Sequence, residues 1–307
     1  MKIFILILLL CSTDVYAKKV SCFVRGKVNK KGKMVIAGAT TPALVEMLEK
    51  KGFEVKFILP EQNYQLDDVK RFHNELKVLF KEVKKVDSLA TLFKKRDFWN
   101  KVPFLKTMRK IITQNLAYMR CDNIILPGGS DVAKEFYQFS DSNVGNFETG
   151  KINYLEDMGY FISIDFALQK KVPVFGFCRG HQAVNVFFGG TLGKFSKMSK
   201  GKRTIKLGGA PSRFSNIFYP KESKNKLLFA HSFYVKRPPK IGKTTAFYYN
   251  KRDKINVSSL YELPQYQMYT TQGHPEGVRV SKVLGLFMMR TDFSKKLFNS
   301  FLDIKKR

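Results

Sequence analysis

Apolar and polar residues alternate along the chain in blocks that predict strands followed by helices. Short apolar segments bounded by polar or turn residues predict buried strands at residues 33–37, 53–59 and 123–126. A fourth predicted strand, residues 172–175, follows residues 158–169, where apolar side chains recur at helical spacing. Repeated strand, helix, strand units with apolar strands predict an α/β fold, with a mostly parallel sheet covered by helices on both faces.

The first predicted helix carries sequence signals at both of its ends. Thr41 can cap its N-terminus, Pro42 suits the first helical position, and Gly52 ends it. After about residue 193 the pattern changes, and it predicts shorter strands, among them residues 227–229 and 267–270. The second half of the chain is therefore expected to be richer in strands.

A long segment between the second and third predicted strands, residues 60–118, interrupts the alternation. Six of its apolar residues recur at helical spacing with Lys and Glu between them: Val69, Phe72, Leu76, Leu79, Phe80 and Val83. This pattern predicts a helix that packs by one stripe. Two interpretations stay open, a lid over a functional site and a peripheral helical decoration.

The first 17 residues predict a cleaved export signal. Lys2 precedes an apolar run at residues 3–10, which is too short to span a bilayer, and small residues occupy the cleavage positions up to Ala17. We expect a secreted or periplasmic protein that begins at or near Lys18 and has no transmembrane anchor. The alternatives are a buried N-terminal strand and a lipid anchor at Cys11, which the bulky residue before it disfavours.

Length and composition fit one globular domain, residues 18–307, with a sizeable core. The chain has 307 residues, of which 44% are hydrophobic, and a net charge of +30. Residues 1–17 contain one Lys and one Asp, so cleavage leaves this charge unchanged. Such a charge can attract anionic partners. The lysines are scattered, however, as a biased genome would also leave them, and we expect no specific nucleic-acid partner.

Three cysteines would remain after cleavage of the signal: Cys22, Cys121 and Cys178. An odd number in an oxidising compartment leaves at least one thiol free or paired outside the chain. A disulfide between Cys22 and Cys121 is possible, and the sequence leaves it open. Cys178 is the candidate for the free thiol.

The segment "GFCRG" places Cys178 between two glycines, directly after a predicted strand. A strand that turns sharply into a helix presents the side chain at the turn on a strained elbow, with the helix N-terminus beneath it. The helix dipole and the free amides there favour a thiolate. Cys178 is therefore a candidate nucleophile, although the motif alone also fits a buried structural cysteine.

The segment "QGHPE" supplies a candidate base and an acid to orient it. On an extended segment, side chains two residues apart face the same way, so Glu276 can hold the imidazole of His274. His274 can then deprotonate Cys178, while Glu276 fixes the tautomer and stabilises the cation. Nucleophile, base and orienting acid are all present in the sequence.

The segment "LPGGSDV", residues 126–132, also follows a predicted strand. Its two consecutive glycines let backbone amides approach a substrate closely, and acyl transfer needs two such donors for the oxyanion. We assign the oxyanion hole to the backbone amides of Gly129 and Arg179. A Pro-Gly-Gly turn by itself would fit an ordinary turn as well.

Together, "LPGGSDV", "PVFGFCRGHQAVNVFFGGTL" and "QGHPE" resemble the class I glutamine amidotransferase-like superfamily, and within it the stand-alone gamma-glutamyl hydrolases of the gamma-glutamyl-gamma-aminobutyrate hydrolase type. The resemblance covers residues 33–59 and 121–292. It implies a flavodoxin-like fold, a triad of Cys178, His274 and Glu276, and cleavage of gamma-glutamyl amides through a thioester. It implies no metal and no organic cofactor.

Three differences from these hydrolases leave the substrate open. Residues 230–234, "AHSFY", look closer to a His-Ser-Tyr segment of some amidotransferases, the stretch after Leu192 is unusually basic, and residues 60–118 have no recognised counterpart. Candidate substrate contacts are Gly128, Gln182, His231 and Ser232. His231 fits a satisfied packing histidine equally well, and His181 and Gln182 are better placed to support the site than to react.

The sequence thus favours a secreted cysteine hydrolase over two alternatives. A glutaminase subunit that passes ammonia to a synthase is disfavoured by export, so we expect no synthase partner. A catalytically idle envelope binding protein is disfavoured by the intact triad. The net charge and the basic stretch from Lys194 to Lys206 favour a small gamma-glutamyl substrate or polymer with an anionic leaving portion.

Overall fold

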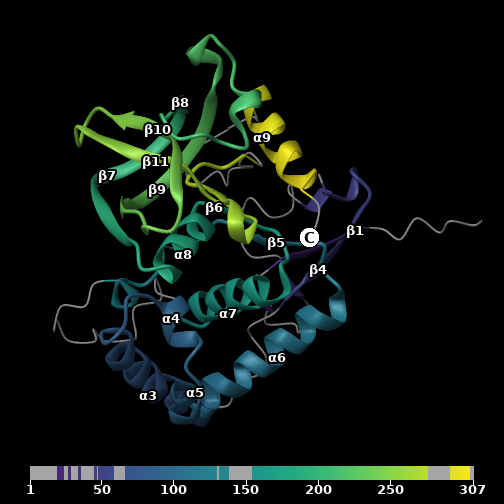
Figure 1. Cartoon of the computed structure of the whole chain (residues 1–307), viewed down its shortest axis with the longest axis vertical. Helices are drawn as coiled ribbons and strands as arrows, with labels where there is room; N and C mark the ends of the chain where they lie inside the picture. Colours follow the sequence, from purple (N-terminus) through teal and green to yellow (C-terminus); the bar gives the residue numbers. More distant parts are fainter. Residues whose placement is uncertain are drawn as a thin grey trace, which may run out of the picture.

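An eight-stranded sheet forms the centre of the computed structural model (Figure 1), which describes residues 19–23, 27–28, 34–35, 45–46, 48–58, 66–129, 131–137, 154–275 and 291–304. The strand order is β4-β1-β5-β6-β12-β11-β10-β8. In chain order the bounds are β1 Lys19–Phe23, β4 Phe53–Phe57, β5 Asn123–Leu126, β6 Val174–Phe177, β8 Lys206–Leu207, β10 Lys243–Asn250, β11 Ile255–Leu263 and β12 Met268–Thr271. The first five strands of the sheet are parallel, and the last three join antiparallel.

The parallel part has the flavodoxin-like order that the resemblance implied. Numbered along the chain, its five strands lie in the order 2-1-3-4-5. Helices cover both faces, as expected: α7 (Tyr154–Lys170) and α8 (Arg179–Phe187) lie on one side and α9 (Asp292–Leu302) on the other. Strand β5 shows why, because Ile124 and Leu126 pack into one core and Ile125 into the other.

The described residues between β4 and β5 form four helices: α3 (Leu66–Val83), α4 (Leu89–Phe93), α5 (Arg96–Lys101) and α6 (Pro103–Met119). The predicted stripe lies on α3, where Phe72, Leu76, Leu79, Phe80 and Val83 are buried. These helices form an outer layer against α7 and α8 (Figure 1), which fits the peripheral interpretation. A connection between parallel strands needs a crossover element, and α6 packs on α7 as such an element.

The sequence did not predict strand β1. Of the predicted strand 33–37, Met34–Val35 form the short β3, which pairs antiparallel with β2 (Lys27–Val28) outside the main sheet. The strands after residue 193 are also not all shorter: β7 (Thr191–Thr204) and β9 (Lys226–Arg237) are long and form their own antiparallel pair. Exposed lysines on β7 interrupt the apolar alternation that marks a strand.

Cys22, Cys121 and Cys178 divide as the sequence allowed. Cys22 in β1 and Cys121 before β5 form a disulfide, with Cα atoms 5.7 Å apart. Cys178 is a free and buried thiol. In the described residues, no helix has the length and apolar character needed to cross a membrane.

Candidate active site

Three of the predicted motifs meet at the carboxyl ends of three neighbouring strands. Gly128 follows β5, Cys178 follows β6 and His274 follows β12, and β6 lies between the other two in the sheet. The backbone amide of Cys178 donates to the Thr271 carbonyl at 2.8 Å, which ties the ends of β6 and β12 together. Ligand sites of open α/β sheets form at this edge.

Gly128 lies where the side chains of Cys178 and His274 converge. A methyl group built on Gly128 would lie 3.3 Å from Cβ of Cys178 and 2.9 Å from Cε1 of His274. Cys178 is 3% exposed and His274 6%, so both residues are buried beside Gly128. The structure thus brings together Gly128, Cys178 and His274, while Glu276 lies outside the described residues.

The turn at Cys178 is a strained elbow, as predicted, but the strain sits on the cysteine itself. Cys178 has φ 52° and ψ −108°, a conformation that non-glycine residues rarely adopt. The flanking glycines serve a different purpose, because a Cβ on Gly180 would lie 2.1 Å from the Leu126 carbonyl oxygen. One on Gly176 would lie 2.8 Å from the Gly180 backbone. They allow α8 to pack directly on the sheet beneath the thiol.

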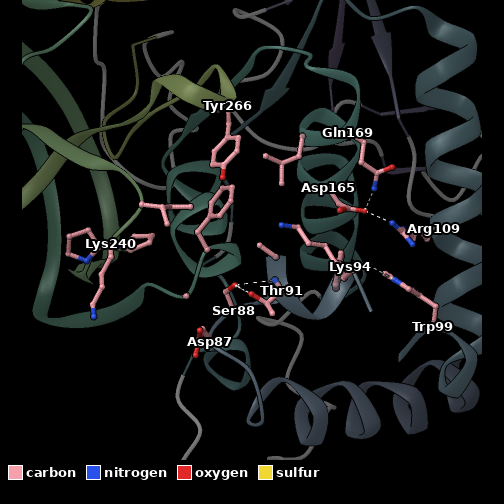
Figure 2. A pocket seen from close by; sticks show the side chains of 18 of the residues that line it. Asp87, Ser88, Thr91, Lys94, Trp99, Arg109, Asp165, Gln169, Lys240 and Tyr266 are labelled. Carbon is pink, nitrogen blue, oxygen red and sulfur yellow. Dashed lines mark hydrogen bonds and ion pairs between the residues drawn. The ribbon is translucent and has the colours of Figure 1, made fainter. Parts of the chain in front are cut away.

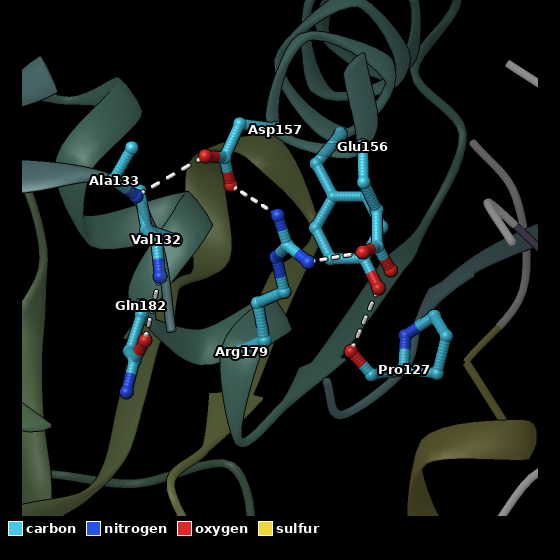
Figure 3. Close-up of polar contacts among 8 residues, drawn as sticks. Pro127, Val132, Ala133, Glu156, Asp157, Arg179 and Gln182 are labelled. Carbon is cyan, nitrogen blue, oxygen red and sulfur yellow. Dashed lines mark hydrogen bonds and ion pairs between the residues drawn. The ribbon is translucent and has the colours of Figure 1, made fainter. Parts of the chain in front are cut away.

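A buried ion-pair network surrounds Arg179, the residue after Cys178. The side chain of Arg179 is fully buried between Glu156 and Asp157 of α7 (Figure 3). Its Nη2 lies 2.6 Å from Asp157, and its guanidinium lies over the ring of Tyr160. Burial alone would lower the pKa of Arg179, but Asp157 and Glu156 raise it above its usual value. Arg179 therefore stays charged and locks the first turn of α8 to α7.

The same network holds the loop that carries the predicted oxyanion donor. Tyr160 donates to the Pro127 carbonyl at 2.9 Å, and the Ala133 amide donates to Asp157 at 3.1 Å (Figure 3). The loop is thus fixed at both ends beside α8, with Gly129 at its exposed part. Such fixed backbone is what an oxyanion hole requires. The assignment to the amides of Gly129 and Arg179 stays a prediction.

Gln182 and His181 act as supports in this arrangement. Gln182 accepts from the Val132 amide at 3.3 Å and donates to Asp131 and to the Phe233 carbonyl, so its amide ties α8 to the loop after β5 and to β9. His181 is buried against the Thr270 hydroxyl at 2.8 Å, and burial lowers its pKa to about 3. A neutral, enclosed imidazole fits the support role.

The contacts of His231 favour the packing interpretation over substrate contact. Its Nδ1 lies 2.6 Å from the Phe233 carbonyl, and its Nε2 lies 3.3 Å from the Tyr248 hydroxyl. Burial, together with the nearby His274, lowers its pKa to about 4. Its neighbour Ser232 is half-buried on β9. Strand β9 also positions His274, since the His274 amide donates to the Leu228 carbonyl at 2.8 Å.

Sequence reasoning missed Glu156, Asp157 and Tyr160. Their signal was present: two consecutive acids lie in a helix that is otherwise almost wholly apolar and buried. Buried carboxylates need a partner, but the spacing along the chain does not name it. Among the described residues, no three His, Cys, Asp or Glu side chains gather in a way that could hold a metal ion.

Parts of the chain are similar in sequence to known proteins. Residues 102–215, which include Cys178 but not His274, match the Peptidase C26 family. The match includes α6, so the expectation that all of residues 60–118 lack a counterpart was too broad. A Schizosaccharomyces pombe protein named as a glutamine amidotransferase is 42% identical over 72 residues, 23% of this chain and 27% of its own length.

A glutamine amidotransferase-like protein of Lactococcus lactis subsp. lactis is 34% identical over 91 residues, 30% of this chain. The matched segments span 27% and 36% of these two relatives. A solved structure from Thermoplasma acidophilum, named for one component of GMP synthase, superposes with a TM-score of 0.50 at 14% identity, covering 93% of this chain and 92% of that one. The family match and these relatives support the resemblance of the chain to the class I glutamine amidotransferase-like superfamily, and the solved structure shares its fold.

Proposed function

We propose that the protein hydrolyses gamma-glutamyl amides through a covalent thioester on Cys178. The superfamily and the Peptidase C26 match support an amidotransferase-type hydrolase of C–N amide bonds. The observation that carries the finer proposal is the convergence of Cys178 and His274 on Gly128, beside a loop held rigidly by α7 and α8. This is the arrangement of nucleophile, base and backbone donors that acyl transfer uses.

The reaction would proceed in two acyl-transfer steps. The Cys178 thiolate attacks the side-chain amide carbon, and the amides of Gly129 and Arg179 hold the oxyanion. The C–N bond breaks as His274, oriented by Glu276, gives its proton to the departing amine. A water that gives its proton to His274 then attacks the thioester, the C–S bond breaks, and the glutamyl acid and the thiolate are released.

The charge of strand β7 supports an anionic leaving portion. Lys194, Lys197, Lys200, Lys202 and Arg203 are exposed along β7, which pairs with β9, the strand that binds the His274 backbone. Burial raises the pKa of Asp131, and Lys194 is near enough for its charge to oppose that shift. Lys194 thus lies near the loop after β5. A cationic rim would raise the encounter rate of anionic gamma-glutamyl compounds or polymers.

Two observations support export of the protein. Residues 1–17 have the pattern of an export signal, and the disulfide between Cys22 and Cys121 suits an oxidising compartment. We therefore propose a secreted or periplasmic hydrolase. The mass of the exported protein is the direct check, because an intact Met1 would contradict cleavage after Ala17.

The decisive experiment compares the mature protein with Cys178→Ala on glutamine and on gamma-glutamyl amides with neutral, anionic and cationic amines. We expect Cys178→Ala to lose turnover by about 10⁴-fold or more while its thermal unfolding stays close to wild type, since the covalent route is gone. Glu276→Gln should lose less, because a neutral acceptor can still hold the imidazole. Undiminished hydrolysis by a folded Cys178→Ala protein would overturn the mechanism, and cleavage of glutamine alone would favour a glutaminase.

The same panel tests the leaving portion through its salt dependence. Attraction between exposed charges is screened beyond about 8 Å at physiological ionic strength. Added salt should therefore slow cleavage of anionic amides and leave neutral ones nearly unchanged. Equal salt dependence, or a preference for cationic amines, would show that the lysines of β7 do not select the substrate.

A further inference from the structure

A hollow lies at the opposite end of α8 from Cys178. It has a volume of about 1420 Å³, and its walls come from α4 and α5, from the last turns of α7, from Phe188 and Gly189 after α8, and from residues 237–241 after β9 (Figure 2). The nine-residue α8 rises about 14 Å between the two places. We call this hollow the α8 cavity. None of the residues assigned to the active site lines it.

One wall of the α8 cavity is apolar and aromatic. The rings of Phe188 and Tyr266 stack with centroids 5.7 Å apart and planes 8° from parallel. Tyr266 is 37% exposed, and Ile241 beside it is 44% exposed, which is unusual for large apolar side chains in the described residues. Figure 2 shows Tyr266 at one side of the cavity and Trp99 at another. Such a wall suits a ring or a compact hydrocarbon body.

The rim of the α8 cavity is strongly basic. Six cations and two acids line it: Lys94, Arg96, Lys106, Arg109, Arg237 and Lys240 against Asp87 and Asp165. Arg109 is already paired with Asp165 at 2.6 Å. No carboxylate among the described residues pairs with Lys94, Arg96, Arg237 or Lys240. Figure 2 shows Lys94 reaching from α4 into the open space.

We propose that the α8 cavity binds a small amphipathic organic anion, with an apolar ring or cage and at least two acidic groups. An apolar ligand without charge would leave the four cations uncompensated, and a cationic ligand would be repelled by them. An inorganic anion would leave the wall formed by Phe188 and Tyr266 unused. The apolar part of such a ligand would pack on the wall formed by Phe188 and Tyr266, and its acidic groups would pair with the cations of the rim.

The protein contains its own reporter for this site. Trp99 lines the cavity and is the single tryptophan of the chain, so its emission reports on this place alone. We would titrate the full chain with 1,3-adamantanedicarboxylate, which absorbs little near 280 nm, and follow Trp99 emission and heat of binding. Two probes separate the contributions: 1-adamantylamine keeps the cage and reverses the charge, and glutarate keeps two carboxylates without the cage.

We expect the dicarboxylate cage to bind at least about tenfold more tightly than either comparison probe, because only it uses both surfaces. Lys94→Gln and Arg96→Gln should each weaken it about three- to tenfold. Lys110→Gln is the matched control, since it removes the same charge from an exposed site on α6 that does not line the cavity. Cys178→Ala should bind the cage unchanged, which separates this proposal from the proposed hydrolysis.

Several outcomes would overturn the proposal. They are equal binding of the amine, no detectable binding of the dicarboxylate, and equal loss in Lys110→Gln and Lys94→Gln. An affinity that falls as protein concentration rises would mean that a second copy of the chain fills the cavity. Lys94 and Arg96 are both exposed, so their variants should fold, and thermal unfolding confirms this before titration.

Discussion

The two ends of α8 differ in whether the cationic side chains beside them are buried and paired with acids. At the N-terminal end, Arg179 is fully buried and matched by two acids, and the neighbouring imidazoles of His181 and His231 stay neutral. At the C-terminal end, the cations of the α8 cavity are exposed, and most of them pair with no carboxylate in the described residues. The N-terminal end of α8 is thus held in a fixed geometry, and the C-terminal end offers cations to an anion that binds from solution.

Two arginines make this contrast specific. Arg179 lies over Tyr160 at 5.3 Å and 2.6 Å from Asp157, while Arg109 lies over Trp99 at 4.4 Å and 2.6 Å from Asp165. The contacts are alike, but the side chain of Arg179 is 0% exposed and that of Arg109 is 25% exposed. Water can therefore compensate for the loss of one arginine and not of the other.

The largest effect on stability should come from Gly180→Ala. The added methyl would lie 2.1 Å from the Leu126 carbonyl oxygen and would force α8 away from β5. We expect a loss of at least about 4 kcal/mol in the free energy of unfolding, or no folded protein. Gly209→Ala is the control, because no atom lies within 4 Å of its Cβ and the change should stay within about 0.5 kcal/mol. Urea unfolding measures both, and a loss below about 1 kcal/mol in Gly180→Ala would show that this end can relax.

The next effect should separate the two arginines. Arg179→Gln leaves Glu156 and Asp157 buried without their cation, and we expect it to cost about 3–5 kcal/mol. Arg109→Gln leaves Asp165 at the wall of the α8 cavity with its hydrogen bond from Gln169, and should cost about 1 kcal/mol. Denaturant unfolding of the two variants under identical conditions is the measurement. Similar losses would contradict the view that the two ends differ in rigidity.

The parts of the site that lie at strand ends could be predicted from the sequence. Each motif follows a short apolar strand, and β5 matches its predicted bounds, Asn123–Leu126. Gly52, predicted to end the first helix, has φ +80°, as a residue after a helix often does. Local spacing was enough here, because the carboxyl ends of parallel strands meet at one edge whatever the rest of the chain does.

Long-range pairing could not be predicted in the same way. The partner of Asp157 lies 22 residues away in Arg179, and the Cys22–Cys121 disulfide spans 99 residues, so neither follows from spacing. Strand β1 was missed because its segment "KVSCF" is short and directly follows the predicted export signal. The α8 cavity combines five separate parts of the chain, and no single motif marks it.

A smaller effect than the loss of Arg179 concerns pH at the active-site end of α8. His231 is buried beside the active site with its pKa lowered to about 4, whereas an unfolded histidine titrates near 6.5. Below pH 6.5 His231 is protonated in the unfolded chain, whereas in the folded chain it stays neutral down to about pH 4. The free energy of unfolding therefore decreases as pH falls through this window. Titration of this one histidine lowers the free energy of unfolding by about 2 kcal/mol between pH 7 and pH 5.

His231→Gln should therefore reduce the loss of stability between pH 7 and pH 5 by about 2 kcal/mol, whatever it does to stability at pH 7. His73→Gln on α3 is the control: burial and Lys77 lower the pKa of His73 too, but this residue is only partly buried, so its contribution should be much smaller. Urea unfolding of wild type and both variants at the two pH values isolates each histidine, because the titration of all other groups is common to the three proteins. An unchanged pH dependence in His231→Gln would mean that water reaches this imidazole in the folded state, and that the active-site end of α8 is more open than its contacts imply.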